Sequence, residues 1–286
     1  MYPILRHSFM KYRGQILGWG IGLALLGGFL LTFYDTLTDQ QESLAAMVEA
    51  YPPEVFAFFG DMATLFTPSG YLHTEFYSYM PIILGFFSIL AGASLLAGDE
   101  ESGVLDLLMA HPVSRTSTFL GRLLAYLAAT FAIFTITWLG FVITEPATQL
   151  NLNPVELALP LLSMFSVLLL YGSTAILLSM VLPSVRLAAT VSVMLLIVSF
   201  FLSSMAKINE DLEQAAQLSP LNYYQGGEAV SGLNWEWFAG LIGISVVILL
   251  AALLVFNRKD IRVGGEGSLG IGGFWKKKER SEAAAD

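Results

Sequence analysis

The sequence predicts an all-α integral membrane protein with six transmembrane helices. Composition is the first indication: 55% of the 286 residues are hydrophobic and only 13% are charged, about half the charged share of a soluble domain. The second is a set of six apolar stretches without Asp, Glu, Lys, Arg or His, each long enough as a helix to cross a bilayer. These stretches are 16–34, 79–97, 123–143, 157–182, 187–206 and 238–256.

Basic residues predict how these helices are oriented. All but one of the 14 Lys and Arg residues precede the first span, follow the sixth, or lie between spans two and three or four and five; the exception is Lys207. Positively charged loops stay in the cytoplasm, so we expect a multi-pass protein of the cell membrane with both termini cytoplasmic. The bases lie near membrane ends, where they suit anionic lipid, and we expect no nucleic-acid partner.

The N-terminal part contains three recognisable features. Residues 1–14 mix apolar and basic side chains, which predicts an interfacial helix along the inner leaflet. In the first span, Gly18-x-x-x-Gly22 permits close helix packing, either within the chain or with a second subunit. The outer segment 35–78 is too long for a plain connector, so we expect one or two short helices on the outer membrane surface.

The segment 98–115, GDEESGVLDLLMAHPVSR, interrupts the apolar pattern between spans two and three. Its apolar residues recur at helical spacing, and the acids that precede them would occupy a first helical turn, where the helix dipole favours negative charge. A proline then ends the helix, and Ser114 can cap the next one. We therefore expect one amphipathic cytoplasmic helix over 99–111, with acids Asp99, Glu100 and Glu101, stripe residues Val104, Leu107, Leu108 and His111, and Pro112 as its stop.

Two interpretations of this helix follow from the residues alone. It can be an ordinary helical turn held by lipid and by the neighbouring spans. It can also be a docking element for a cytoplasmic partner, which would explain the acids and the apolar stripe together.

The remaining segments carry weaker signals. Outer segment 207–237 ends with Trp235 and Trp237, aromatics typical of a membrane interface before a span. In the tail, Gly265-x-Gly267-x-x-Gly270 matches a dinucleotide fingerprint formally, but the strand and helix that should flank it are missing. A flexible glycine-rich stretch followed by basic residues is the better interpretation of 263–286.

Several kinds of chemistry are absent from the sequence. It contains no Walker-A pattern and no His-Glu-x-x-His, so we expect no enzyme activity and no metal site in this chain. His73 and Glu75 are both predicted near the outer membrane face, but two ligands do not make a zinc site. Proton-coupled carriers usually keep ionisable residues at membrane depth, and the six spans have none. Energy for any uphill transport is therefore expected from elsewhere.

Three motifs resemble those of ABC type-2 transporter permeases. LAGDEESGVLDLLMAHPVSRTSTFLGRLLA is similar to the family's cytoplasmic connection between spans two and three: an acidic pair, Gly-Thr-Leu-Glu/Asp-Leu-Leu-Leu, then Pro-Val-Ser-Arg. Val104 replaces the usual Thr. LSPLNYY, residues 218–224, resembles the Ser-Pro-x-x-Tyr element before the last span. FNRKDI, residues 256–261, resembles the Phe-x-Arg-Arg-Asp-Ile that ends it, with Lys259 in place of one Arg.

The resemblance implies the permease subunit of an ATP-binding-cassette transporter, usually an exporter. Two permeases, copies or paralogues, would pair, and separate ATPase subunits carrying ATP and Mg would bind beneath them. The helix 99–111 would be the coupling helix, with Leu107 and Leu108 in the ATPase cleft and Arg115 anchoring the third span. The residues so assigned are Glu100, Glu101, Gly103, Asp106, Leu107, Leu108, Pro112 and Arg115.

This interpretation divides the chain into a permease domain over 1–262 and a tail over 263–286. No cofactor is expected in the chain itself. The alternative is a non-transporting membrane scaffold that recruits a soluble partner through the acidic helix. The two differ in whether binding stimulates an ATPase.

Overall fold

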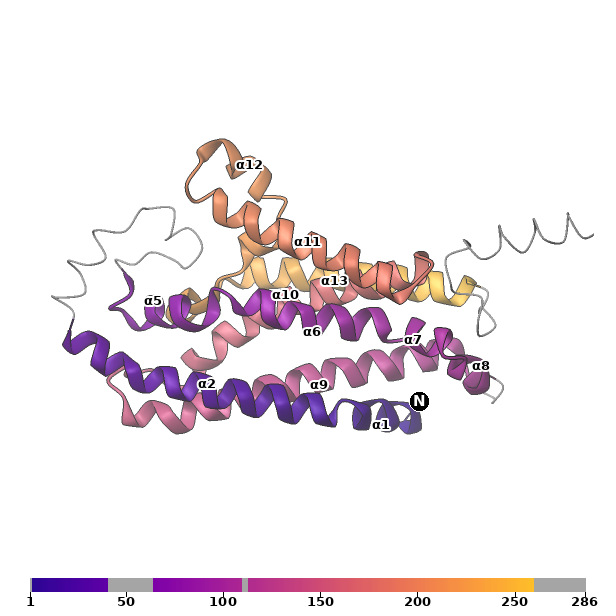
Figure 1. Cartoon of the computed structure of the whole chain (residues 1–286), viewed down its shortest axis with the longest axis horizontal. Coiled ribbons are helices and arrows are strands. Elements are labelled where there is room, and N and C mark those ends of the chain that lie inside the picture. Colours follow the sequence, from indigo (N-terminus) through magenta and orange to yellow (C-terminus); the bar gives the residue numbers. More distant parts are fainter. Residues whose placement is uncertain (1, 41–63, 110–112, 260–286) are drawn as a thin grey trace, which may run out of the picture.

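The computed structural model describes residues 2–40, 64–109 and 113–259, and every regular element within them is a helix (Figure 1). Five long helices are apolar enough to cross a membrane. A sixth span results if α6 is joined to the helical stretch 68–77, from which it is bent by 46°. The five are α2 (Arg13–Asp39), α9 (Arg115–Thr144), α10 (Pro154–Val181), α11 (Val185–Met205) and α13 (Trp235–Arg258). The helix of the bent pair, α6 (Met80–Ser94), has 15 residues and is shorter than the predicted span 79–97.

Short helices lie before and between the long ones. α1 (Tyr2–Lys11) forms where an interfacial helix was expected, and α5 (Pro68–Leu72) with the π-helix η2 (His73–Tyr77) lies in the predicted outer segment. Two further short helices, α7 (Ala97–Glu101) and α8 (Val104–Met109), follow α6. The remaining ones are η3 (Glu145–Ala147), η4 (Glu210–Leu212), α12 (Glu213–Ala216), η5 (Pro220–Tyr223) and η6 (Gly226–Ser231).

Four of the long helices begin at a side-chain cap. Ser114 accepts a hydrogen bond from the backbone N–H of Ser117 at 3.1 Å, as predicted. Ser184 and Asn234 cap α11 and α13 in the same way, and Asn153 forms a capping box with Glu156 at the start of α10. These caps satisfy N–H groups that have no partner within the helix.

α10 is the central helix of the bundle. In its most apolar stretch 72% of the residues are buried, compared with 17% in α13, and it packs against both α6 and α13. The α6 contact depends on small residues, because a Cβ on Gly92 would lie 2.5 Å from the carbonyl oxygen of Gly172. Beside it, Ser88 donates to the carbonyl of Leu168 at 2.6 Å and pairs with the Tyr126 hydroxyl at 2.5 Å.

α2 packs against α9 through a different set of glycines from those singled out in the sequence. A Cβ on Gly27 would meet the buried ring of Phe141, whereas Cβ atoms on Gly18 and Gly22 would have nothing within 4 Å. The Gly18-x-x-x-Gly22 face is therefore exposed and makes no close contact within the described chain.

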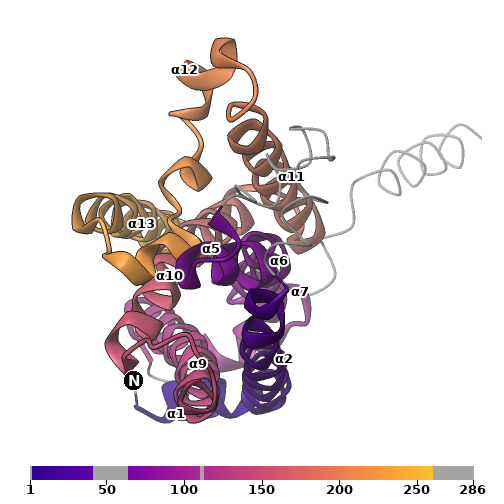
Figure 2. The same cartoon turned by 90° about the vertical axis from the view of Figure 1, so that its left-hand side faces the viewer.

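Successive long helices alternate in direction, so the segments that connect them lie at two ends of the bundle. These two ends differ in charge. Every described Lys and Arg except Lys207 belongs to the end that holds α1, α7 and α8, called here the basic end (Figure 1). The acidic end holds α5 and α12; there the Asp35 carboxylate accepts the Gln149 N–H at 2.8 Å. Viewed along the bundle, α1 and α9 lie on the side opposite α11 and α12 (Figure 2).

Candidate functional site

The segment after α6 forms two short helices, so the expectation of one continuous helix over 99–111 is wrong. α7 (Ala97–Glu101) holds the three acids, and α8 (Val104–Met109) holds the apolar residues that follow. Gly103 between them has φ +72°, a left-handed conformation that glycine adopts without the usual steric cost. His111 and Pro112 lie outside the described residues, as do the side chains of Asp106 and Leu107.

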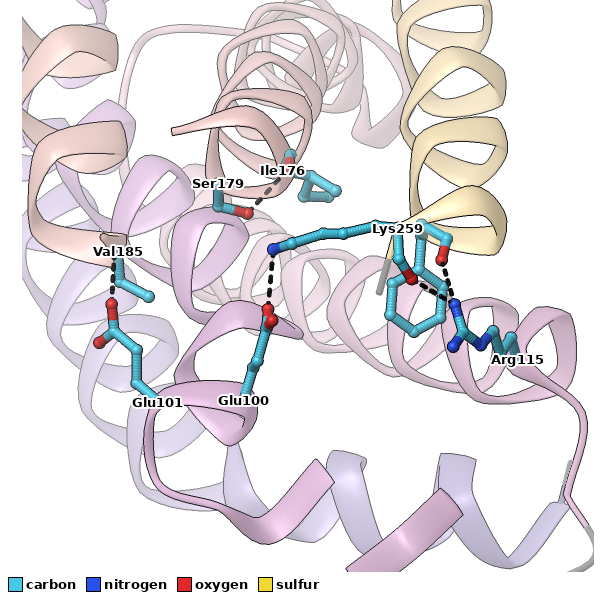
Figure 3. A network of polar contacts seen from close by, with 8 residues as sticks. Glu100, Glu101, Arg115, Ile176, Ser179, Val185 and Lys259 are labelled. Carbon is cyan, nitrogen blue, oxygen red and sulfur yellow. Dashed lines mark hydrogen bonds and ion pairs between the residues drawn. The ribbon is translucent and has the colours of Figure 1, made fainter. Parts of the chain in front are cut away.

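Glu100 connects α7 to the end of α13. Its side chain is buried, with the residue 8% exposed, and its carboxylate lies 2.9 Å from the Lys259 ammonium (Figure 3). A buried carboxylate is stable in such a place only when it is paired and hydrogen-bonded. The Glu100 carboxylate therefore makes a contact within the chain and does not lie on an outer surface.

Glu101 connects α7 to the start of α11. Its carboxylate accepts the backbone N–H of Val185 at 2.7 Å (Figure 3). Val185 is the first residue of α11, whose cap is Ser184. A negative charge at this position is stabilised by the positive end of the helix dipole, and it satisfies an N–H that the helix itself leaves unpaired.

Arg115 connects the start of α9 to the end of α13. Its guanidinium donates to the carbonyl oxygens of Phe256, Asn257 and Lys259 at 3.2, 3.5 and 2.5 Å. Nearby, the Asn257 side-chain amide lies 3.4 Å from the Thr116 hydroxyl. The last carbonyls of a helix lack internal partners, and the rigid fork of donors on Arg suits them. Arg115 thus joins two spans.

Asp99 and Arg122 form a further contact that the sequence did not reveal. Arg122 is 6% exposed; its guanidinium pairs with Asp99 and also donates to the Leu95 carbonyl at 3.0 Å. Lys11 of α1 lies 3.6 Å from the same carboxylate. Partial burial, with a smaller contribution from Arg122, lowers the pKa of Lys11. Because these residues lie on separate helices, no local pattern signals their pairing.

Three consecutive acids therefore attach α7 to different helices of the bundle. Asp99 contacts α9 and α1, Glu100 contacts the end of α13, and Glu101 contacts the start of α11. α8 lies beyond these contacts, with Val104 41% exposed and Leu108 half-buried. Of the predicted site residues, the structure brings Glu100, Glu101 and Arg115 into one network at the basic end.

The fold and this network define a multi-pass helical membrane protein in which one short loop helix is joined to several spans. The family model described as ABC-2 family transporter protein matches residues 2–261. The chain belongs to this family, and it is a membrane permease component of an ABC transporter. A search of curated proteins finds no match to the sequence.

Proposed function

We propose that this chain is the transmembrane subunit of an exporter driven by ATP that a separate ATPase subunit hydrolyses. The ATPase, with its ATP and Mg, binds at the basic end, which faces the cytoplasm by the positive-inside rule. A second permease, a copy or a paralogue, completes the transporter. The observation that carries the proposal is the attachment of α7 to α9, α11 and α13 through consecutive acids.

This attachment supplies a route for mechanical coupling. α8 is the contact surface for the ATPase, through Val104 and its neighbours, and α7 passes any displacement to three spans. Charge-assisted hydrogen bonds such as Glu100–Lys259 at 2.9 Å and Glu101–Val185 at 2.7 Å are short and directional. They make α7 move together with the helix ends that it holds.

The acids of α7 act differently from the direct ATPase contact that the sequence suggested. Glu100 and Glu101 transmit force within the permease, since both carboxylates are already bound to other helices. Gly103 separates the docking part from the transmitting part. Arg115 holds the start of α9 against α13, so that the displacement of one span reaches the other.

Site-specific photo-crosslinking in native membranes tests this function. A photoreactive amino acid replaces Val104 in one variant, and Leu218 at the acidic end, which is 87% exposed, in the control. We expect an ATPase with a Walker-A motif to be captured from Val104 and not from Leu218. Capture of a soluble protein without ATPase motifs from Val104 would favour the scaffold alternative, and capture of no partner would contradict both functions.

A further inference from the structure

A membrane-facing groove lies between α10, α11 and α13 toward the acidic end. Its volume is about 750 Å³. Val198 and Ile244 in its walls are 60% and 54% exposed, so the groove opens sideways toward the lipid. Most of its walls are apolar and come from two predicted spans, including Leu195, Val198, Leu202, Leu241, Ile244 and Ile248.

The mouth of the groove is polar, aromatic and acidic. Glu236 and Trp237 line it from the first turn of α13, where Asn234 caps their backbone N–H groups. The ring of Tyr223 meets that of Trp237 edge-on, with centroids 5.7 Å apart. None of the described residues that line the groove is basic; Lys207 lines a separate, smaller pocket that shares Trp237.

A buried polar group also lines the groove. Tyr171 is 4% exposed, and its hydroxyl has no hydrogen-bond partner of good geometry among the described residues, although Ser199 lies beside it. Buried hydroxyls usually have a partner. The Ser199 side chain can complete this hydrogen bond within the protein.

These features together fit one class of ligand. From Trp237 to Ile248, α13 rises about 16 Å, roughly half of a ~30 Å hydrocarbon core, so the apolar walls match one leaflet. A carboxylate beside an aromatic pair favours a cationic head group, because ring faces attract ammonium ions. We propose that the groove binds a membrane amphipath with an ammonium head at Glu236 and Trp237 and an alkyl chain along α11 and α13. That this amphipath is also the transported substrate rests on the proposed export function.

Photolabelling tests the binding without any ATPase. The full chain, purified into discs of neutral lipid, is exposed to two probes that share a diazirine-bearing dodecyl chain and differ in head group, trimethylammonium or sulfate. We expect the ammonium probe to label the peptides containing Val198 and Ile244, saturably, with competition by unlabelled dodecyltrimethylammonium. Equal labelling by the sulfate probe would show ordinary lipid contact and would overturn the proposal, as would an absence of labelling on α11 and α13.

Matched variants locate the head group. Glu236→Gln and Trp237→Leu should each lower ammonium-probe labelling about fivefold. Asp39→Asn, which removes an exposed acid at the same end, should leave the labelling unchanged. Each variant is first shown to keep the thermal stability of the parent; a stable Glu236→Gln protein with full labelling contradicts the proposal.

The two proposals fail separately. Selective labelling without capture of an ATPase at Val104 would support the binding site and contradict the export function. ATPase capture without selective labelling would support the permease function and contradict the proposed class of ligand. If both hold, dodecyltrimethylammonium should stimulate ATP hydrolysis by the assembled complex, and Glu236→Gln should weaken that stimulation.

Discussion

The Glu100–Lys259 pair combines a stabilising contact with a cost. Both side chains are largely buried, with 9% of Glu100 and 17% of Lys259 exposed. Removing two charges from water costs free energy, which their attraction offsets only while both are present. Loss of one partner is therefore worse than loss of both.

Lys259→Met should lower the free energy of unfolding by about 1–3 kcal/mol, because the buried Glu100 carboxylate loses its partner. The double variant Glu100→Gln/Lys259→Met should recover most of this loss. Thermal unfolding of the purified protein in detergent measures both. Equal destabilisation by the single and double variants would show that the unpaired Glu100 charge is not the cause of the loss.

At the scale of elements, close helix contacts depend on where a glycine faces rather than on its spacing. Gly92 lies against the backbone of Gly172, which cannot move aside as a side chain can. Gly22 faces outward with nothing within 4 Å. The same substitution at these two positions therefore has different physical consequences.

Gly92→Ala should destabilise the protein by about 1–3 kcal/mol through overpacking between α6 and α10. Gly22→Ala, its matched control, should be neutral or stabilising, because alanine has the higher helix propensity, by about 1 kcal/mol. Thermal unfolding compares the two. A Gly22→Ala protein as unstable as Gly92→Ala would contradict the described helix packing.

The break between α7 and α8 is a second property of elements. Gly103→Ala should cost about 1 kcal/mol or more, because alanine disfavours the left-handed conformation at φ +72°. No neighbour lies within 4 Å of the added Cβ, so a purely backbone effect is expected. Under the proposed function, the Gly103→Ala permease should stimulate ATP hydrolysis by the complex less than the parent permease does. ATPase capture at Val104 should persist. Unchanged stimulation would show that the break has no part in coupling.

For the whole molecule, the separation of charge between the two ends predicts its orientation. The sequence contains no cysteine, so single cysteines report position without background. Arg186 and Glu210 are both exposed, at the basic and the acidic end respectively. Their opposite placement makes them a matched pair.

On intact cells, Glu210→Cys should react with a membrane-impermeant maleimide, whereas Arg186→Cys should react only after permeabilisation. The physical reason is the retention of basic loops on the cytoplasmic side. Labelling is measured by the mass shift of the protein. The reverse pattern would invert the proposed orientation and place the amphipath groove in the inner leaflet.

Local properties of the sequence determined the helices, because hydropathy, caps and charge act over one or two turns. The apolar stretches became helices, Ser114 became a cap, and the family predicted from the motif around Glu100 is the one whose model matches residues 2–261. Only the tertiary structure decided which helices those residues join. Glu100 and Lys259 are separated by 159 positions, and their pairing depends on packing that brings the end of α13 beside α7. The same packing turned Gly27 inward and Gly18 outward, since contacts between helices follow from the whole bundle and not from the period of one helix.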